Sequence, residues 1–239
     1  MNAETNYLLA SLFAAGTRTE LELHIRTVEL EKGQVLAEPL ERMHSVYFPT
    51  SGIIAFLVPL TDGSSVQAGI VGADGAVGAL QALGGGVSPS RLVVQMPGRA
   101  AVIEAAQIGK IAQATPSARS LILSHEQFNV AKLQQSAACN AVHTVRQRMC
   151  RWLLRMSDLS GRNIAVTQES FSEMLGVQRT SVTLAAAFLQ KAGAIRYRRG
   201  HIHILDIELL KASSCECYAA LRRSYDRLVK ASNGVLRAQ

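Results

Sequence analysis

Five polar side chains with hydrogen-bonding groups stand close together in the segment TQESFSEMLGVQRTSVTLAAAFL, residues 167–189. The guanidinium of Arg179 can donate two parallel hydrogen bonds, a geometry that matches O6 and N7 of guanine in the DNA major groove. A helix fits this groove with its first turn against the base edges. We therefore expect the segment to read bases through the following residues: Gln178, Arg179, Thr180, Ser181 and Thr183.

A helix–turn–helix would position these side chains. Thr167 is a plausible N-cap of a first helix, because its hydroxyl precedes a helical pattern. Gly176 stands where the chain must leave that helix, and glycine adopts a positive φ without a Cβ penalty. Apolar residues give both helices an inward face: Phe171, Met174, Leu175, Val182, Ala185, Ala186 and Leu189. This spacing predicts a helix–turn–helix.

The next stretch, AIRYRRGHIHILD, predicts two short strands joined at Arg199-Gly200. Apolar Ile195, Ile202 and Ile204 alternate with polar residues, as in a half-buried hairpin. A hairpin after a helix–turn–helix makes a winged helix. We expect phosphate contacts, which position a protein on DNA without reading its sequence, from Thr167, Arg196, Arg198, Arg199 and His201.

The charge distribution favours an anionic partner for the same half of the chain. The 239-residue chain has a net charge of +7. Residues 1–120 hold 8 Lys and Arg against 10 Asp and Glu, whereas residues 121–239 hold the remaining 17 against 8. Such asymmetry is typical of nucleic-acid binding, although a solvated basic surface would look the same.

A second group of residues could bind a metal. His201-x-His203 and Cys215-x-Cys217 together make a two-histidine, two-cysteine set suited to zinc. The C-x-C spacing is short for such a site, and a helix over 215–217 would turn the two thiols apart. The competing interpretation is a phosphate-facing wing with reduced thiols in a terminal helix. Metal- or thiol-responsive regulation stays an alternative, and we expect no resident metal or cofactor.

His143 and Arg146 are expected to be surface or dimer contacts.

The first half of the chain predicts an all-β barrel or roll. Between Glu31 and Glu104, short apolar runs alternate with glycine turns. The runs are VLAEPL, SVYFP, GIIAFLVPL, SVQAGIV, RLVVQM and RAAVIE. A helical pattern over residues 5–30 precedes them.

From about residue 117 an apolar stripe predicts one long helix. Its period of three to four residues gives a face that packs along a partner, and a two-fold homodimer is the simplest choice. Packing on the chain's own β domain is the alternative. The expected dimer contacts are Val130, Leu133, Ala137, Ala141, Val145 and Met149. We thus expect an α+β chain in three parts: a β-roll sensor at 1–120, a dimerisation helix at 121–160, and a winged helix with a C-terminal helix at 161–239.

The order of these parts resembles the Crp/Fnr family of bacterial transcription regulators. The resemblance spans roughly residues 8 to 206. It rests on two stretches, VELEKGQVLAEPLERMHSVYFPTSGIIAFLVPLTDGSSVQAGIVGADGAVG and VTQESFSEMLGVQRTSVTLAAAFLQKAGAIRYRRGHIHILD. The second stretch is the more specific match. It implies a cyclic-nucleotide-binding-like jelly roll, a homodimer on a two-fold symmetric DNA site, RNA polymerase as a partner if the protein is an activator, and Arg179 as the base-reading arginine. Thr180 and Leu184 depart from the residues common there, so the preferred DNA sequence should differ.

Two effector signatures that the resemblance implies, for a cyclic nucleotide and for an iron–sulfur cluster, are not found in this sequence. The resemblance implies a Gly-Glu pair and an Arg-Ser or Arg-Thr pair for a cyclic nucleotide. Here no Glu lies between Glu41 and Glu104, and Arg91 is followed by Leu92. No Cys precedes Cys139, which argues against an N-terminal iron–sulfur cluster.

Other function classes find little support. Motifs of hydrolases, phosphate loops and zinc proteases are missing, so we expect no enzyme. No apolar run reaches the length of a membrane span and the N-terminus lacks a basic signal region, so we expect a cytoplasmic protein without membrane contact. A small-molecule-binding module whose winged helix contacts protein is a further alternative.

Overall fold

The computed structural model describes residues 6–84 and 86–237 and divides them into two compact units. Unit 1 comprises the described residues up to Phe56, then Ile70–Ala131 and the chain from Arg223 onward. Unit 2 comprises Leu57–Gly69 and Lys132–Arg222. Among the described residues, no helix is long and apolar enough to cross a membrane.

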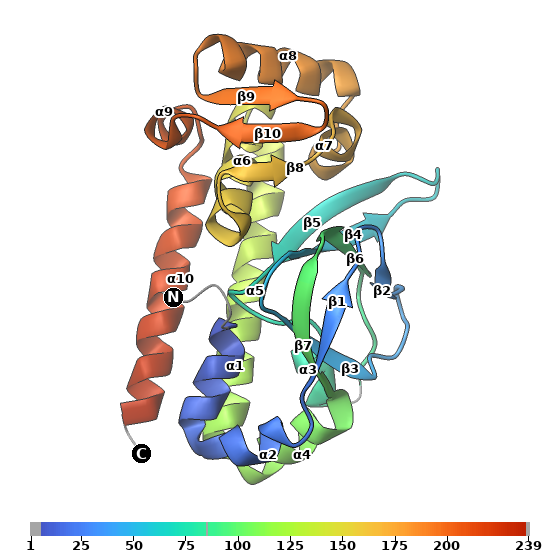
Figure 1. Ribbon diagram of the computed structural model, residues 1–239, viewed down its shortest axis with the longest axis vertical. Coiled ribbons are helices and arrows are strands. Elements are labelled where there is room, and N and C mark those ends of the chain that lie inside the picture. The colour runs from blue at the N-terminus through green and yellow to red at the C-terminus, as the bar shows by residue number, and fades with distance from the viewer. Residues whose placement is uncertain (1–5, 85, 238–239) are drawn as a thin grey trace. The chain divides into compact units, whose positions relative to one another are not determined.

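The strands of the first half form two antiparallel-paired sheets, labelled in Figure 1. One sheet has the order β1-β7-β3 and the other β2-β6-β4-β5. The strands are β1 (Arg26–Leu30), β2 (Val35–Ala37), β3 (Ser45–Pro49), β4 (Ile53–Pro59), β5 (Ser65–Val71), β6 (Arg91–Met96) and β7 (Gly98–Glu104). All six apolar runs that predicted strands contain one, which confirms the β-rich first half.

Alternation along these strands explains why they face one core. In β6, Leu92, Val94 and Met96 are buried while the residues between them are partly exposed. Leu92 and Val94 join Leu30 and Val102 in one apolar cluster. Burying one face of each sheet in this way drives the two sheets together.

The predicted helix over residues 5–30 is wrong after residue 22. The structure has α1 (Tyr7–Leu12), a π-helical turn (Phe13–Thr17) and α2 (Arg18–Glu22), followed by β1. Gly16 interrupts the helix with a φ of 87°. Residues 26–30 pair with β7, so tertiary pairing decides their conformation.

The expected single helix at 121–160 is two helices. After α3 (Ala79–Ala82) and α4 (Ala105–Ala114) come α5 (Pro116–Val142) and α6 (Val145–Ser160). Thr144 begins α6 with a capping box: its hydroxyl accepts from the backbone of Gln147, whose side chain accepts from the backbone N–H of Thr144. This reciprocal cap stabilises a new helix start and so ends the apolar stripe of α5.

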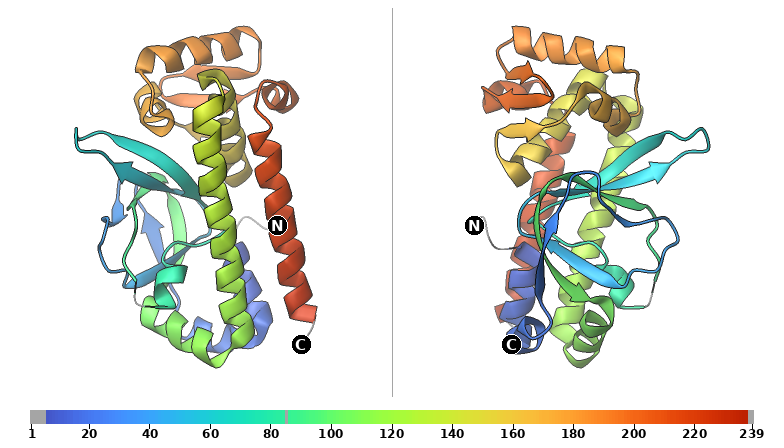
Figure 2. Two further views of the ribbon diagram at one scale, coloured as in Figure 1. Left: turned by 180° about the vertical axis from the view of Figure 1, so that it is seen from behind. Right: turned by 45° about the vertical axis from the view of Figure 1, so that its right-hand side comes forward.

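Unit 2 contains the winged helix. Its helices α7 (Gln168–Leu175) and α8 (Arg179–Lys191) are flanked by a sheet of order β8-β10-β9, with strands β8 (Asn163–Ala165), β9 (Ile195–Arg198) and β10 (His201–Ile204). β8 was not anticipated. The expected last helix divides into α9 (Ile207–Ala212) and α10 (Cys217–Arg237). Figures 1 and 2 show α8 running alongside β9, an edge strand of this sheet.

Candidate nucleic-acid interface

The first helix of the pair begins as the sequence predicts. The backbone N–H of Ser170 donates to Oγ1 of Thr167 at 3.1 Å, which makes Thr167 the N-cap of α7. The Thr167 hydroxyl also lies 3.0 Å from Oγ of Ser170. Thr167 therefore has a structural role in starting α7, beside the phosphate contact expected from its position.

The turn between the helices depends on Gly176. Its φ of 58° and ψ of 46° are left-handed, and its N–H and that of Val177 donate to carbonyls in the last turn of α7. A Cβ at this position would lie 3.5 Å from the Val66 side chain, in ordinary contact, so conformation rather than space favours glycine.

A buried arginine fixes the end of α7. Arg148 on α6 donates a hydrogen bond from Nη2 to the carbonyl oxygen of Leu175. Burial lowers the pKa of Arg148. A charged donor on a helix-terminal carbonyl supplies a partner that the helix itself cannot. The turn before α8 is thereby joined to α6.

The second helix presents the predicted residues on its outer face. Val182, Ala185, Ala186 and Leu189 are buried, whereas Gln178, Arg179, Thr180 and Thr183 are exposed and Ser181 is half-buried. Arg179 is the first residue of α8 and lies at its N-terminus.

One predicted base-reading residue is already engaged by its own chain. Oγ1 of Thr183 lies 3.0 Å from Oε1 of Gln168 and 3.0 Å from the carbonyl oxygen of Arg179. A hydroxyl carries one proton, so Thr183 donates to one of these acceptors. The contact with Gln168 holds α8 against the first turn of α7.

The hairpin of β9 and β10, the wing, also has the predicted form. Arg199 and Gly200 both have positive φ, 48° and 79°, as a two-residue hairpin turn requires. Ile195, Ile202 and Ile204 are buried beneath it. The side chains expected to contact phosphate are exposed on it: Arg196, Arg198, Arg199 and His201.

The wing and α8 are joined by a direct hydrogen bond. The backbone N–H of Tyr197 donates to Oε1 of Gln190 at 2.8 Å. This bond adds to the shared apolar core, so the exposed arginines of the wing keep a fixed relation to the first turn of α8. Such an arrangement can contact bases and backbone phosphates of one duplex together.

A cation–aromatic contact joins the start of α6 to the exposed face of α8. The guanidinium of Arg146, at the start of α6, lies 4.2 Å from the centroid of the exposed Phe188 ring on α8. A cation over an aromatic face is attracted by the ring quadrupole. The sequence predicts only a surface or dimer contact for Arg146. Its contact with Phe188 could not be predicted, because no spacing rule links residues on separate helices.

Comparison with known proteins places this geometry in a family. A model described as Crp-like helix-turn-helix domain matches residues 147–213, and one described as Cyclic nucleotide-binding domain matches residues 27–115. The chain is a Crp/Fnr-type transcription regulator. As such it is a DNA-binding protein. No curated protein matches the chain.

Solved structures of Crp/Fnr-type and related proteins share the fold at low identity. FixK2 from Bradyrhizobium japonicum superposes with a TM-score of 0.70 at 13% identity, covering 80% of this chain and 98% of its own. A putative Crp/Fnr regulator from Eubacterium rectale gives 0.65 at 15%, covering 82% and 93%. The c-di-GMP-responsive global regulator CLP of Xanthomonas campestris gives 0.62 at 17%, covering 80% and 99%.

The predicted dimer residues of this Crp/Fnr-type chain fall into two groups. On α5, Val130, Leu133, Ala137 and Ala141 are exposed. Val145 is half-buried at the start of α6. Met149 is only 1% exposed and lines a small apolar space with Phe171, Val182 and Ile202, so its assignment to the dimer interface is corrected. The new helix start at Thr144 turns Met149 into the core of unit 2.

The helix α10 contacts a different side of α5. Nε2 of Gln135 donates to Sγ of Cys217 at 2.9 Å, and the rings of Phe128 and Tyr225 lie 5.6 Å apart. Figure 2 shows the two helices side by side. The apolar residues at 130, 133, 137 and 141 thus form a face distinct from the one that α10 contacts.

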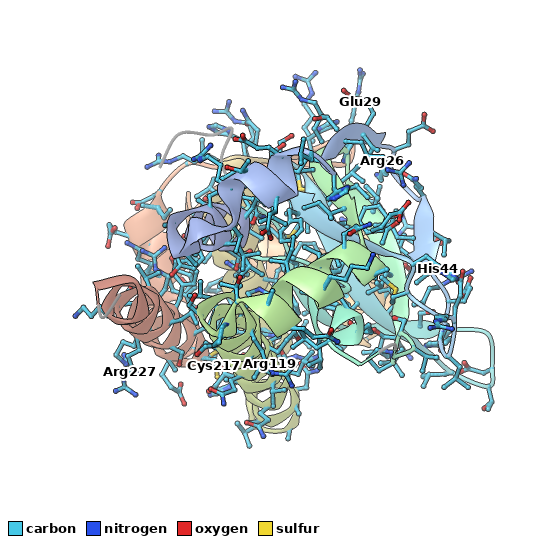
Figure 3. The ribbon with its side chains drawn as sticks, turned by 90° about the horizontal axis from the view of Figure 1, so that it is seen from below. Arg26, Glu29, His44, Arg119, Cys217 and Arg227 are labelled. Carbon is cyan, nitrogen blue, oxygen red and sulfur yellow. The ribbon has the colours of Figure 1, made fainter. Side chains whose placement is uncertain are left out.

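In unit 1, Arg91 forms an ion pair. Its Nε and Nη2 lie 3.0 Å and 2.8 Å from Oε1 of Glu38. A cavity of about 410 Å³ in unit 1 is lined by two arginines, Arg26 and Arg42, and also by His44 and Glu104. Arg26 and His44 are labelled in Figure 3.

The metal set suggested by the sequence does not assemble as proposed. His203 on β10 contacts Oδ1 of Asn163 through Nδ1, and His201 is exposed. Within the described part of the chain, neither histidine joins a group of three candidate ligands. Cys215 and Cys217 do have partners, but these are Cys139 and His143. Distance in sequence hid these two from the spacing analysis.

Proposed function

We propose that the protein is a homodimeric, sequence-specific regulator that binds a two-fold symmetric DNA site, with α8 as the recognition helix. The observation that carries the proposal is the exposure of Arg179 in the first turn of α8, beside an arginine-rich wing in the same unit. A bidentate arginine contact with guanine gives sequence discrimination of about 1–3 kcal/mol per base.

Other first-turn residues would refine this readout. Gln178 begins α8 as an N-cap without a capping side-chain bond to any described residue, so its amide is available for a base. Thr180 and Ser181 are short donors and acceptors that suit either base of a pair. Thr183 would act chiefly by holding α8, since its hydroxyl is used within the chain.

The wing would supply affinity rather than specificity. Arg196, Arg198, Arg199 and His201 would contact the phosphate backbone, and each such contact releases counterions. A Cβ on Gly200 would lie 3.4 Å from Cγ2 of Thr167, so the wing turn and the start of α7 are neighbours. Both would therefore approach the same DNA backbone.

A second copy of the chain would cover the exposed face of α5. Val130 is 50% and Leu133 39% exposed, although both are apolar. Ala137, Ala141 and Val145 would continue the contact toward the start of α6. Exposed apolar residues in a row favour association, and closed two-fold dimers are the commonest solution. Two recognition helices related by two-fold symmetry would then read two half-sites.

The protein would exchange between a form that binds DNA strongly and one that binds it weakly. An effector at the β-roll would shift this equilibrium by binding one form more tightly than the other. The basic cavity of unit 1 has a volume suited to a small molecule and favours an anionic one. RNA polymerase would be a further partner if the protein activates transcription, and the cytoplasm is the compartment in which these partners meet.

Selection from a random double-stranded DNA pool tests the proposal. Full-length protein should enrich a symmetric motif whose half-sites lie about one helical turn apart. Affinity for this motif should fall steeply with salt, because phosphate contacts release counterions. Failure to enrich DNA, alone and with cell extract added, together with salt-insensitive capture of a protein, would replace the proposal with a protein-binding winged helix.

A further inference from the structure

Three thiols and one imidazole converge inside unit 2, on segments other than α7, α8 and the wing. The sulfur–histidine cluster consists of Cys139, His143, Cys215 and Cys217, whose ligand atoms all lie within 4.8 Å of one another. The sulfurs of Cys139 and Cys215 are 3.6 Å apart, and Sγ of Cys217 is 3.6 Å from Nδ1 of His143. The three cysteines are buried as thiols and His143 is half-buried.

Two separate segments bring these groups together. Cys139 and His143 are four residues apart at the end of α5, and the N–H of His143 still donates to the carbonyl of Cys139 at 3.1 Å. Residues with this spacing share one helix face. Cys215 lies in the link after α9, and Cys217 is the first residue of α10 (labelled in Figure 3). Because residue 215 is not helical, the two thiols of C-x-C can face the same centre.

The distances suit a tetrahedral metal ion. Thiolates bind zinc at about 2.3 Å and imidazole nitrogens at about 2.0–2.1 Å, so the ligand atoms of a tetrahedral site are separated by about 3.5–3.8 Å. The two 3.6 Å separations already match this value. The remaining ligand-atom pairs lie within 4.8 Å, so small side-chain rotations would bring them to the tetrahedral separation.

The groups behind the ligands complete the pattern of a metal centre. Nε2 of His143 lies 3.2 Å from a carboxylate oxygen of Glu216, which orients the ring with Nδ1 toward Cys217. Metal-binding histidines commonly donate their other nitrogen to a carboxylate in this way. Gln135 donates to the sulfur of Cys217 at 2.9 Å, a contact that stabilises a thiolate.

A buried cation balances the charge that such a site would carry. Three thiolates around a divalent ion leave one net negative charge. Arg151 is buried, and its Nε and Nη2 have no hydrogen-bond partner among the described residues. Nη1 of Arg151 donates to Oγ of Ser136 at 3.3 Å, and Ser136 lies three residues before Cys139 on α5. A buried positive charge is therefore held within one helical turn of the cluster, where it can serve as the counterion of an anionic metal centre.

We propose that Cys139, His143, Cys215 and Cys217 form a three-cysteine, one-histidine site for a thiophilic divalent metal ion, zinc above all. The site ties the end of α5 to the segment between α9 and α10. The metal ion displaces the thiol protons, which pass to solvent as the thiolates form, so no redox step is involved.

Metal titration of the full-length reduced protein tests this site. Added Co²⁺ should give one equivalent of tetrahedral, thiolate-type absorption per chain, and Zn²⁺ should displace it and raise the Tm. Cys139→Ser, Cys217→Ser and the milder His143→Asn should each weaken zinc binding at least tenfold, within the range seen when metal ligands or their supports are removed. Cys150→Ala and the pair His201→Asn with His203→Asn should bind as the wild type does. Circular dichroism confirms that each variant is folded.

Three results would overturn the proposal. One is a reduced wild-type protein that binds less than one equivalent of either ion. Another is binding that survives in folded Cys139→Ser and Cys217→Ser variants. The third is a Cys139–Cys215 disulfide in protein purified without reductant whose reduced form takes up no metal, which would assign the pair to thiol redox chemistry instead.

Discussion

Nη2 of Arg148, on α6, donates to the carbonyl oxygen of Leu175, the residue before the Gly176 turn. This buried contact joins α6 to the point at which α7 gives way to α8. It therefore connects the helix that follows the proposed dimer face with the side chains that would read DNA.

Replacing Arg148 with Ala should destabilise unit 2. The change leaves the Leu175 carbonyl without its charged donor, and hydrogen bonds to charged groups are worth about 1.5–3 kcal/mol. Chemical denaturation should show a loss of this size in the free energy of unfolding. Arg119→Ala, at an exposed position on α5, is the matched control and should change stability little. Equal stability of the two variants would show that the contact does not hold the turn.

Thr167→Ala should cost about 1 kcal/mol of stability through loss of the α7 cap, whereas Thr167→Ser should retain most of it. Thermal unfolding measures both. DNA affinity measured far below the Tm separates a phosphate contact from the cap, since a pure cap loss leaves the folded interface unchanged. An Ala variant as stable as the wild type would mean that the bond to Ser170 does not cap the helix.

Leu133→Asp should convert the protein to monomers in light scattering, because a charge within the apolar face of α5 must be desolvated in a dimer. Leu205 has the same exposed fraction, 39%, but lies after β10 in the winged helix. Leu205→Asp should stay dimeric. If Leu133→Asp is dimeric as well as Leu205→Asp, the subunit contact lies elsewhere.

The variant Arg196→Gln with Arg198→Gln should weaken binding to all DNA sequences alike. The slope of log affinity against log salt should flatten by about 0.9 for each phosphate that the variant no longer neutralises. Arg199 is left in place, since its positive φ is part of the hairpin turn. Lys110→Ala removes a charge from unit 1 and should leave the salt slope unchanged. A shift in base preference on altering the wing would contradict its phosphate role.

Local patterns in the sequence were sufficient for the winged helix and most of the β-roll. Thr167, Gly176 and the alternating isoleucines of the wing are each determined by residues within one or two turns. The break at Thr144 was also readable, because Thr144 and Gln147 form a capping-box pair. It was missed because the apolar spacing continues through it to Met149.

Contacts between distant segments could not be predicted in this way. Cys139 and Cys215 stand 76 positions apart, and they meet because the link between α9 and α10 lies against the end of α5. The strand β8 has three residues, too few for an alternating pattern, and depends on pairing with β10. β1 likewise forms because β7 is available beside it.

The most direct test of the account is to repeat the DNA selection with Arg179→Ala beside the wild type. Lys191→Ala is the control, since it removes an equal charge from the last turn of the same helix. We expect the wild type and Lys191→Ala to enrich the same symmetric motif. Arg179→Ala should lose the preference at one guanine in each half-site, by about 1–3 kcal/mol, while keeping salt-sensitive affinity. An unchanged motif with Arg179→Ala would contradict the assignment of α8 as the helix that reads the sequence.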